Sequence, residues 1–393
     1  MRKALLGTLL AALFAVPAGA QQTVKIGLIM PYSGQFADTA TQMDNAIKLY
    51  VKEHGDTVAG KKIEFIRKDT GGIAPDVAKR LAQELVVRDK VDIIGGLILT
   101  PNALAVGDIS AEAKKFTVIM NAATSIITTK SPYMARTSVT TPMLNQTLGT
   151  WAATKGGVKK VYTMVSDYGP GHDAEGAFHL GFKEAGGEVV GSVRFPVANP
   201  DFSAFVQRAK DSNAEAIYVW IPGGAQPAAI AKALFERGID PKKTKILGQD
   251  VVADDSVLKG LGEQSVGLIT VTNYDYNRKT PLNQKFLAGF REMSGGRNPD
   301  IFAIGGYDGM HLIYESLKKT AGKTDGDSLI EAAKGMKWES PRGPMMIDPE
   351  TRDVVEDMYI LRVEMVEGKP QNVEFDKVKD VKDPVKARMK KQN

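Results

Sequence analysis

Small and hydroxyl-bearing residues follow two apolar runs of the sequence, and they are the residues best placed to bind an anion. The run at 93–99 is followed by Thr100-Pro101-Asn102-Ala103, and the run at 116–120 by Asn121-Ala122-Ala123-Thr124-Ser125. Both segments can open a helix, whose first N–H groups are unpaired and lie at the positive end of the helix dipole. The pattern predicts a carboxylate site, although the same residues could simply cap their own helices.

Aromatic and acidic residues follow other apolar runs. The residues that we place at such ends or near the cleft are Tyr32, Tyr168, Trp220, Gly224, Asp250 and Tyr307. An isolated aromatic residue belongs more often to a core, but several at corresponding strand ends favour the walls of a pocket. Asp250 could bind an ammonium group or a ligand hydroxyl, and capping a turn is its alternative role.

Motifs for enzymatic chemistry are weak. His172, Glu175 and His179 are spaced to share one face of a helix and could ligate a metal, but a solvated helix face is the favoured interpretation because no further ligand is clustered with them. The segment Ala321–Thr324 resembles the end of a P-loop. It lacks the earlier glycine, and a helix pattern precedes it instead of following it, so we reject that motif. We therefore expect a protein that is not an enzyme and needs no cofactor or metal.

The composition is that of a globular protein with roughly two domains. The chain has 393 residues, of which 43% are hydrophobic and 25% charged. It contains no cysteine, which excludes disulfides, thiol nucleophiles and iron–sulfur clusters. The formal net charge of +5 falls to +3 without residues 1–20, which hold two basic and no acidic residues. So small a charge does not indicate a nucleic-acid partner.

The first twenty residues have the three parts of a secretory signal peptide. Arg2 and Lys3 precede an apolar run at 4–16, and Ala18-Gly19-Ala20 supplies small residues for cleavage. The apolar run is shorter than a membrane-spanning helix requires, so an anchor is the less favoured alternative. Without a cysteine to carry a lipid, we expect a periplasmic protein.

Strand-like and helix-like segments alternate along the rest of the chain. Predicted strands lie at 25–30, 62–69, 91–97, 116–121, 159–167, 188–195, 216–221, 244–250 and 266–273, and amphipathic helices separate many of them. This alternation predicts an α/β fold with doubly wound parallel sheets. Residues 344–364 are typical of a hairpin instead, and the Lys- and Asp-rich segment after residue 376 is expected to be a solvated tail.

The strand–helix pattern runs twice, which suggests two similar lobes that close around a ligand. We assign residues 21–140 and 275–342 to the first lobe. Residues 141–274 and 343–393 are assigned to the second lobe. Ligands of open α/β sheets bind beyond the carboxyl ends of the strands, so the residues described above should face the cleft between the lobes.

The order of several segments resembles the type I periplasmic solute-binding proteins of ABC importers, in the Leu/Ile/Val-binding family. The resemblance rests on "VKIGLIMPYSG", "DIIGGLILTPNALAV", "FTVIMNAATS", "SPYMARTSVTT" and "VYTMVSDYGPG", and it covers essentially the whole mature chain. It implies two lobes joined by three crossovers and a ligand bound between them.

The resemblance also implies roles for individual residues. The ligand carboxylate would be held by Thr100, or by Asn102, and by Ala122, Ala123 and Thr124. Tyr168 and Tyr307 match aromatic residues of the cleft, and Asp250 matches the acid that receives the ammonium group. Amino-acid binders usually carry the longer Glu at that position, and some carry tyrosines where Pro222-Gly223-Gly224 stand here. Both differences leave room near the ammonium end or the ligand side chain.

Our leading hypothesis is a periplasmic receptor that delivers a small carboxylate, such as a branched-chain amino acid, to the membrane permease of an ABC transporter. An aromatic carboxylate, an amide or a urea-like ligand is the main alternative, since Trp220 and the tyrosines could stack on a ring. A sensory ligand-binding protein and a periplasmic metalloenzyme are the other hypotheses.

Overall fold

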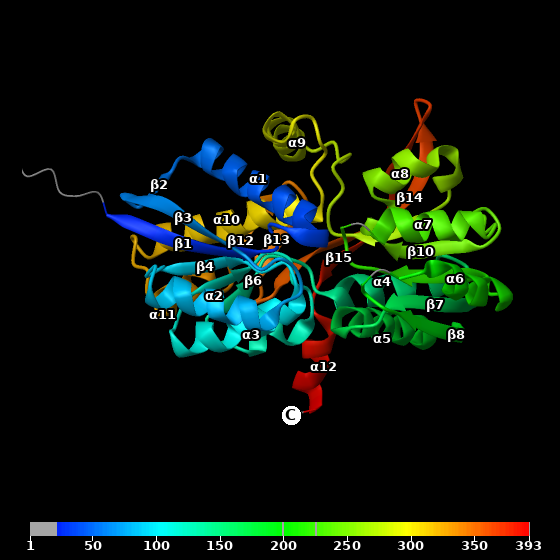
Figure 1. Cartoon of the computed structure of the whole chain (residues 1–393), viewed down its shortest axis with the longest axis horizontal. Coiled ribbons are helices and arrows are strands. Elements are labelled where there is room, and N and C mark those ends of the chain that lie inside the picture. Colours follow the sequence, from blue (N-terminus) through cyan, green and yellow to red (C-terminus); the bar gives the residue numbers. More distant parts are fainter. Residues whose placement is uncertain (1–21, 199, 225, 393) are drawn as a thin grey trace, which may run out of the picture.

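The protein consists of two α/β lobes that lie side by side (Figure 1). The computed structural model describes residues 22–392 apart from 199 and 225. Each lobe has its own sheet with helices on both faces, as the alternating sequence predicts. The predicted signal peptide lies outside the described residues.

The first lobe is built on a six-stranded sheet. Its strands follow the spatial order β2-β3-β1-β4-β5-β6, and all neighbours are parallel except β2 and β3. The strands are β1 (Thr23–Met30), β2 (Thr57–Val58), β3 (Lys61–Asp69), β4 (Ile93–Gly96), β5 (Thr117–Ile119) and β6 (Met134–Arg136). The strands β1 and β4 are almost wholly buried, as expected of parallel strands covered on both faces.

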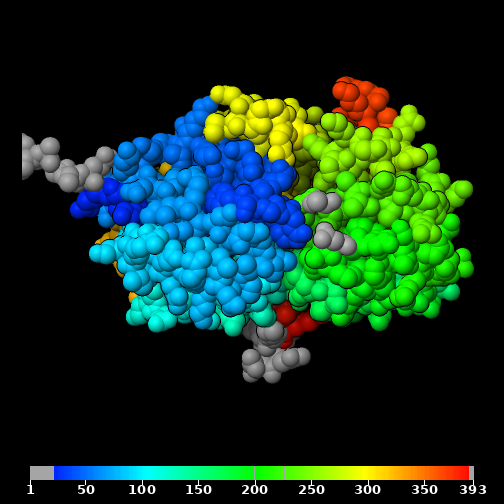
Figure 2. Space-filling view, viewed as in Figure 1, coloured from blue at the N-terminus to red at the C-terminus, as the bar shows by residue number. Residues whose placement is uncertain are grey.

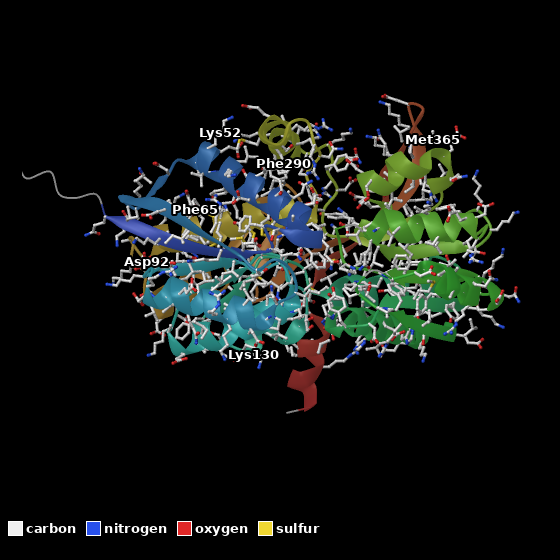
Figure 3. The ribbon with its side chains drawn as sticks, viewed as in Figure 1. Lys52, Phe65, Asp92, Lys130, Phe290 and Met365 are labelled. Atoms are coloured by element: carbon white, nitrogen blue, oxygen red, sulfur yellow. The ribbon has the colours of Figure 1, made fainter. Side chains whose placement is uncertain are left out.

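Helices from both ends of the chain cover this sheet. They are α1 (Ala37–His54), α2 (Pro75–Val87), α3 (Thr100–Glu112), α9 (Pro281–Ser294), α10 (Ile301–Lys319) and α11 (Gly326–Ala333). One core joins α1, α9 and α10 to one face, and a second core joins α2 and α3 to the other. Figure 3 labels Phe290, the fully buried residue through which α9 enters the first of these cores.

The second sheet is mixed and belongs mainly to the second lobe, while β12 and β13 at its end pack on the core of the first lobe. Its order is β12-β13-β14-β11-β10-β9-β7-β8, with β15 paired to β14. The strands are β7 (Lys160–Ser166), β8 (Glu188–Phe195), β9 (Ala216–Trp220), β10 (Lys245–Gln249), β11 (Ile269–Thr272), β12 (Lys337–Ser340), β13 (Gly343–Ile347), β14 (Val354–Val366) and β15 (Lys369–Val381). The helices are α4 (Thr141–Thr154), α5 (Gly169–Glu184), α6 (Phe202–Asp211), α7 (Gln226–Glu236), α8 (Asp255–Leu261) and α12 (Pro384–Gln392).

The predicted fold class is confirmed, and so is the hairpin at 344–364, which is the antiparallel pair β13 and β14. The segment expected to be a solvated tail is largely exposed, but it forms a strand and a helix of the fold. Most of it forms β15, which pairs with β14 along nearly its whole length, and α12, which runs down from the junction of the lobes (Figure 1). Alternating charges hid this strand because one of its faces is exposed to solvent.

The last passage of the chain between the lobes lies close to β13 and β14. Ile347 of β13 belongs to the core of the first lobe, and the backbone of Arg136 in β6 donates to the carbonyl of Arg352. The crossing takes place within β14, whose first residues pair with β13 and whose later residues pair with β11. Figure 3 labels Met365 at the far tip of the β14–β15 hairpin.

In the part of the chain that the structure describes, none of the helices has the length and apolar character needed to cross a membrane.

Candidate functional site

A narrow cavity lies where the two lobes meet, beyond the carboxyl ends of β4, β5, β9 and β10. Figure 2 shows the two lobes in contact along this junction. The first lobe contributes Phe36, Thr39, Ile98, Leu99, Thr100, Asn121, Ala123, Val139, Ile301 and Phe302. The second lobe contributes Thr141, Leu144, Tyr168, Pro170, Trp220, Ile221, Pro222, Gly223, Gln249 and Val251.

Four of the predicted residues line this cavity, namely Thr100, Ala123, Tyr168 and Trp220. Two of them come from the predicted carboxylate segments and two from the predicted aromatic wall. Residues far apart in the sequence are therefore brought together as the strand ends predicted. Their role in binding stays a prediction.

The carboxylate corner, residues 121–125, is tied to the start of α3. The amide of Asn121 donates to the carbonyl of Ile98 at 2.9 Å, and the hydroxyl of Thr124 lies 3.2 Å from that of Thr100. Both threonines are buried, but Thr100 lines the cavity and Thr124 does not. The helix that we expected to open at Ser125 is only the 3-10 turn Ser125–Thr129.

A buried arginine holds the corner from behind. The Arg136 guanidinium donates to the carbonyls of Ala122 at 3.1 Å and Thr124 at 2.9 Å, and it pairs with Asp353 at 3.0 Å. These bonds fix the backbone of the corner, together with the bond from the N–H of Ala122 to the carbonyl of Leu97 at 2.9 Å. Such a fixed backbone suits a ligand site, because little reorganisation is needed on binding.

Two helix N-termini point at the cavity without a side-chain cap. The first turn of α3 starts at Thr100 and contains Pro101, and α5 starts after Tyr168 and contains Pro170. Neither N-cap residue accepts a hydrogen bond from the helix with its side chain. One positive helix end from each lobe therefore faces the same space, which favours a negative ligand there.

The wall formed by the second lobe is aromatic. The rings of Tyr168 and Trp220 are 5.8 Å apart and inclined at 47°. Trp220 is 5% exposed, and its Nε1 donor has no hydrogen-bond partner among the described residues. Gln249 lies beside Trp220, because β9 and β10 are adjacent parallel strands. This wall combines a surface for a planar ring with polar groups.

The glycines after β9 allow the lobes to approach closely. A Cβ on Gly223 would lie 2.8 Å from the ring of Phe302, and one on Gly224 would lie 2.6 Å from the carbonyl of Gln35. Gly224 also has φ of +89°, which disfavours other residues. The room that these glycines leave is therefore filled by the first lobe, and Gly224 lines a neighbouring cavity instead of this one.

Asp250, which we expected to face the ligand, does not line this cavity. It is the first residue of the 3-10 turn Asp250–Ala253, and its side chain lines the neighbouring cavity, whereas Gln249 and Val251 on either side of it line the first. Burial raises the pKa of Asp250 to about 7. Successive side chains of a strand point to opposite faces. The sequence could therefore have shown that Gln249 and Asp250 point in different directions.

Three other predicted residues serve the structure of the first lobe. Asn102 accepts from the backbone of Ala74 and donates to the carbonyl of Gly72, both at 2.9 Å. Ala122 is 1% exposed and packs behind the corner. Tyr32 packs on the core of the first lobe, and burial raises the pKa of its hydroxyl.

Tyr307 is a core residue of the first lobe and not a wall of the cleft. Its hydroxyl donates to Glu53 at 2.6 Å, and its ring lies 4.9 Å from that of Tyr50. The residue lies within α10, whose buried face is directed at α1. Phe302, one helical turn nearer the start of α10, lines the cavity in its place.

The histidine face on α5 is used for hydrogen bonds. Glu175 pairs with Arg194 at 2.8 Å, His172 with Asp167 at 2.7 Å, and His179 with the hydroxyl of Thr163 at 3.0 Å. Across residues 22–392, with 199 and 225 left aside, no group of three or more His, Asp or Glu side chains is placed to hold a metal ion.

Sequence reasoning missed several lining residues, among them Phe36, Thr39, Leu144, Gln249 and Phe302. Thr141 was also missed, although the pattern "TTPM" is a recognisable helix start, and its backbone N–H donates to the carbonyl of Ala123 at 2.7 Å. Gln249 ends β10, where strand periodicity could have identified it, whereas the others lie in helices or turns whose orientation no local pattern reveals.

Fold and cavity together define a bilobed solute-binding protein that holds a small ligand between its lobes. A family model described as "Periplasmic binding protein" matches residues 23–370. The chain belongs to this family, in its Leu/Ile/Val-binding branch, and acts as the solute-binding component of an ABC transporter.

Relatives of this chain have been named or solved. It is 40% identical over 364 residues to "Leu/Ile/Val-binding protein homolog 6" of Brucella melitensis, covering 92% of this chain and 93% of that protein. A solute-binding protein of an ABC transporter from Rhodopseudomonas palustris BisB5, solved with 3,4-dihydroxybenzoic acid, is 50% identical, with a TM-score of 0.89 and coverage of 93% and 99%. Another from R. palustris, solved with 4-hydroxybenzoate, is 39% identical, with a TM-score of 0.89 and coverage of 93% and 100%.

Proposed function

We propose that the ligand of this solute-binding protein is a small aromatic carboxylate that bears a ring hydroxyl, of the hydroxybenzoate type. The protein would capture it in the periplasm, after removal of residues 1–20, and pass it unchanged to the membrane permease. A hydroxybenzoate is preferred to the amino acid that we first favoured.

The lining of the cavity carries this proposal. Among the described residues that line it, none is an acid that could receive an ammonium group, because Asp250 faces another cavity. An ammonium group buried without an acceptor would cost several kcal/mol, on the order of 3 or more. The carboxylate end of an aromatic acid meets Thr100, Ala123 and two positive helix ends, and its ring meets aromatic side chains.

The ring hydroxyl has partners on the opposite wall. The Nε1 donor of Trp220 lacks an acceptor among the described residues, and Gln249 is a polar residue beside it. The bound acids of the relatives, at 50% and 39% identity, support the same ligand class.

Isothermal titration calorimetry would test the proposal with 4-hydroxybenzoate, 3,4-dihydroxybenzoate, benzoate, leucine and phenylalanine. We expect the hydroxybenzoates to bind at least about 100-fold more tightly than either amino acid, which corresponds to about 2.8 kcal/mol. Phenylalanine is the matched control, since it has the ring and the carboxylate but adds an ammonium group. Equal or tighter binding of leucine would overturn the proposal.

A further inference from the structure

A second cavity, of about 390 Å³, lies between the lobes next to the first one, and Ile301 lines both. We name it the acidic cavity. Six aspartates line it, Asp38, Asp275 and Asp300 from the first lobe and Asp250, Asp254 and Asp255 from the second. The proposed uptake of an aromatic acid makes no use of this space.

Positive charge does not balance the acids of this cavity. Arg297 is engaged by Asp38, with two hydrogen bonds of 2.7 and 2.8 Å, and Lys259 is exposed on α8. Six carboxyl groups therefore share two cationic side chains. Burial raises the pKa of Asp300 to about 8 and that of Asp275 to about 6, as it does for Asp250.

Three acceptor oxygens of the cavity have no donor among the described residues. They are Oε1 of Gln42, Oδ1 of Asn372 and Oδ1 of Asp250, and all three are buried. The two amides donate normally, Gln42 to the carbonyl of Asn298 at 3.2 Å and Asn372 to the carbonyl of Ala253 at 2.8 Å. Gln42 is only 5% exposed. Buried acceptors are nearly always paired. We therefore expect these three oxygens to accept hydrogen bonds from a donor outside the chain.

We propose that the acidic cavity is a second ligand site, which takes a small organic cation with several N–H donors, such as a protonated primary amine. The carboxylates supply the charge, and the three unpaired oxygens supply directed acceptors on α1, β15 and the turn after β10. Among the described residues the acids do not converge as a metal site requires. An ammonium group, with three donors, matches acceptors that are spread around a cavity.

Such a cation would couple to the other cavity. Its acceptors belong to both lobes, and the amide of Asn298 already crosses the junction to Asp255 at 2.7 Å. A cation bound there favours the closed lobes, so it should tighten the binding of a carboxylate in the first cavity, and the carboxylate should tighten cation binding by the same factor.

Binding should also release protons, because a cation favours the ionised carboxyl groups. Asp250 and Asp300 are partly protonated near neutral pH and would lose protons as the cation enters. The affinity should therefore increase as the pH is raised from about 6 to 8. Other charged side chains line the same cavity, and their charges act on Asp250 and Asp300. They are Asp38, Asp254, Asp255, Asp275, Lys259 and Arg297.

The test is a calorimetric titration of the full chain with 1,4-diaminobutane at pH 8, without any aromatic acid, in two buffers that differ in ionisation enthalpy. We expect binding, an observed heat that differs between the buffers, and no binding of the neutral isostere 1,4-butanediol. The result does not depend on the proposed carboxylate ligand, so the failure of one proposal leaves the other standing.

The variant Asp250→Asn should weaken diamine binding about tenfold or more, equivalent to about 1.4 kcal/mol. Asp167→Asn is the matched control, because Asp167 is an exposed acid that pairs with His172 outside the cavity, and it should bind as the unmodified protein does. Thermal unfolding would check that both variants fold. The proposal is overturned by no binding at ~10 mM diamine, by equal binding of the diol, or by unchanged affinity in Asp250→Asn. The cavity would then hold only solvent.

Discussion

At the scale of single residues, Thr100 and Thr124 are in contact but differ in whether they line the cavity. Thr100 lines the cavity between the lobes, whereas Thr124 does not, and the two hydroxyl groups lie 3.2 Å apart. Both residue types suit an anion site in the sequence, but only Thr100 faces the ligand cavity. The sequence alone predicts the same role for both threonines, whereas the structure places only Thr100 in the lining of the cavity.

The variant Thr100→Val keeps the shape of the side chain and removes the hydroxyl. We expect it to weaken 4-hydroxybenzoate binding by about 1.5–3 kcal/mol, the range for a hydrogen bond to a charged group. Thr124→Val is the control and should lose less, since Thr124 does not line the cavity. Calorimetry measures both, and a larger loss in Thr124→Val than in Thr100→Val would show that the roles are reversed.

At the scale of secondary-structure elements, α12 is fastened to the back of the carboxylate corner. The ammonium of Lys386 lies 2.5 Å from Asp353, which also pairs with Arg136, and Ser125 donates to Asp383 at 2.5 Å. The Lys386 side chain is 8% exposed, and burial lowers its pKa. The end of the chain, which leaves β15 in the second lobe, thus supports a binding corner of the first lobe.

Replacing Lys386 by Met should destabilise the protein by about 3 kcal/mol, because it removes one partner from a buried charge cluster. Lys382→Met is the matched control four residues earlier. Lys382 pairs with Asp348 but is 58% exposed, so its loss should cost about 0–1 kcal/mol. Urea unfolding measures both variants, and equal effects would mean that the Lys386 pair contributes no more than a surface ion pair.

At the scale of the whole molecule, one buried cluster joins the three passages between the lobes. Arg342 pairs with Asp308 at 2.9 Å and with Glu356 of β14 at 3.3 Å, and it donates to the carbonyl of Thr137 in the first passage. Asn273, at the second passage, donates to Glu356 at 3.2 Å. The three passages are therefore joined at a charged but buried point.

This burial has a consequence for stability against pH. Burial raises the pKa of Glu356 to about 7, and those of Asp250, Asp275 and Asp300 to about 7, 6 and 8. The folded state therefore binds more protons than the unfolded state above about pH 5. The stability from these groups is present at low pH and is lost as the pH rises from about 5 to 8, by up to about 1.4 kcal/mol per pH unit for each group.

Two buried histidines act in the opposite direction. Burial lowers the pKa of His179 and His311, so their contribution is lost as the pH falls. Since the raised acids outnumber them, we expect the urea midpoint to fall between pH 5.5 and 8. Glu356→Gln should make that slope shallower. A midpoint that rises with pH, or a slope that the variant leaves unchanged, would contradict this prediction.

Local patterns were sufficient to determine much of this protein. Alternating strands and helices predicted the α/β lobes, because parallel strands covered on both faces read as short apolar runs. Residues just after those runs predicted Thr100, Ala123, Tyr168 and Trp220 at the cavity, since the carboxyl ends of parallel strands meet at one edge.

Only the tertiary structure decided which way the remaining side chains face and what fills the space around them. Asp250 and Gln249 are neighbours at one strand end, yet they line different cavities. Tyr307 lies on a helix face that packs on α1, and β15 is a strand because β14 offers it an edge. Such outcomes depend on contacts between segments far apart in the chain. The proposed ligand class rests on them too, because Asp250 lines a different cavity from Thr100 and Trp220.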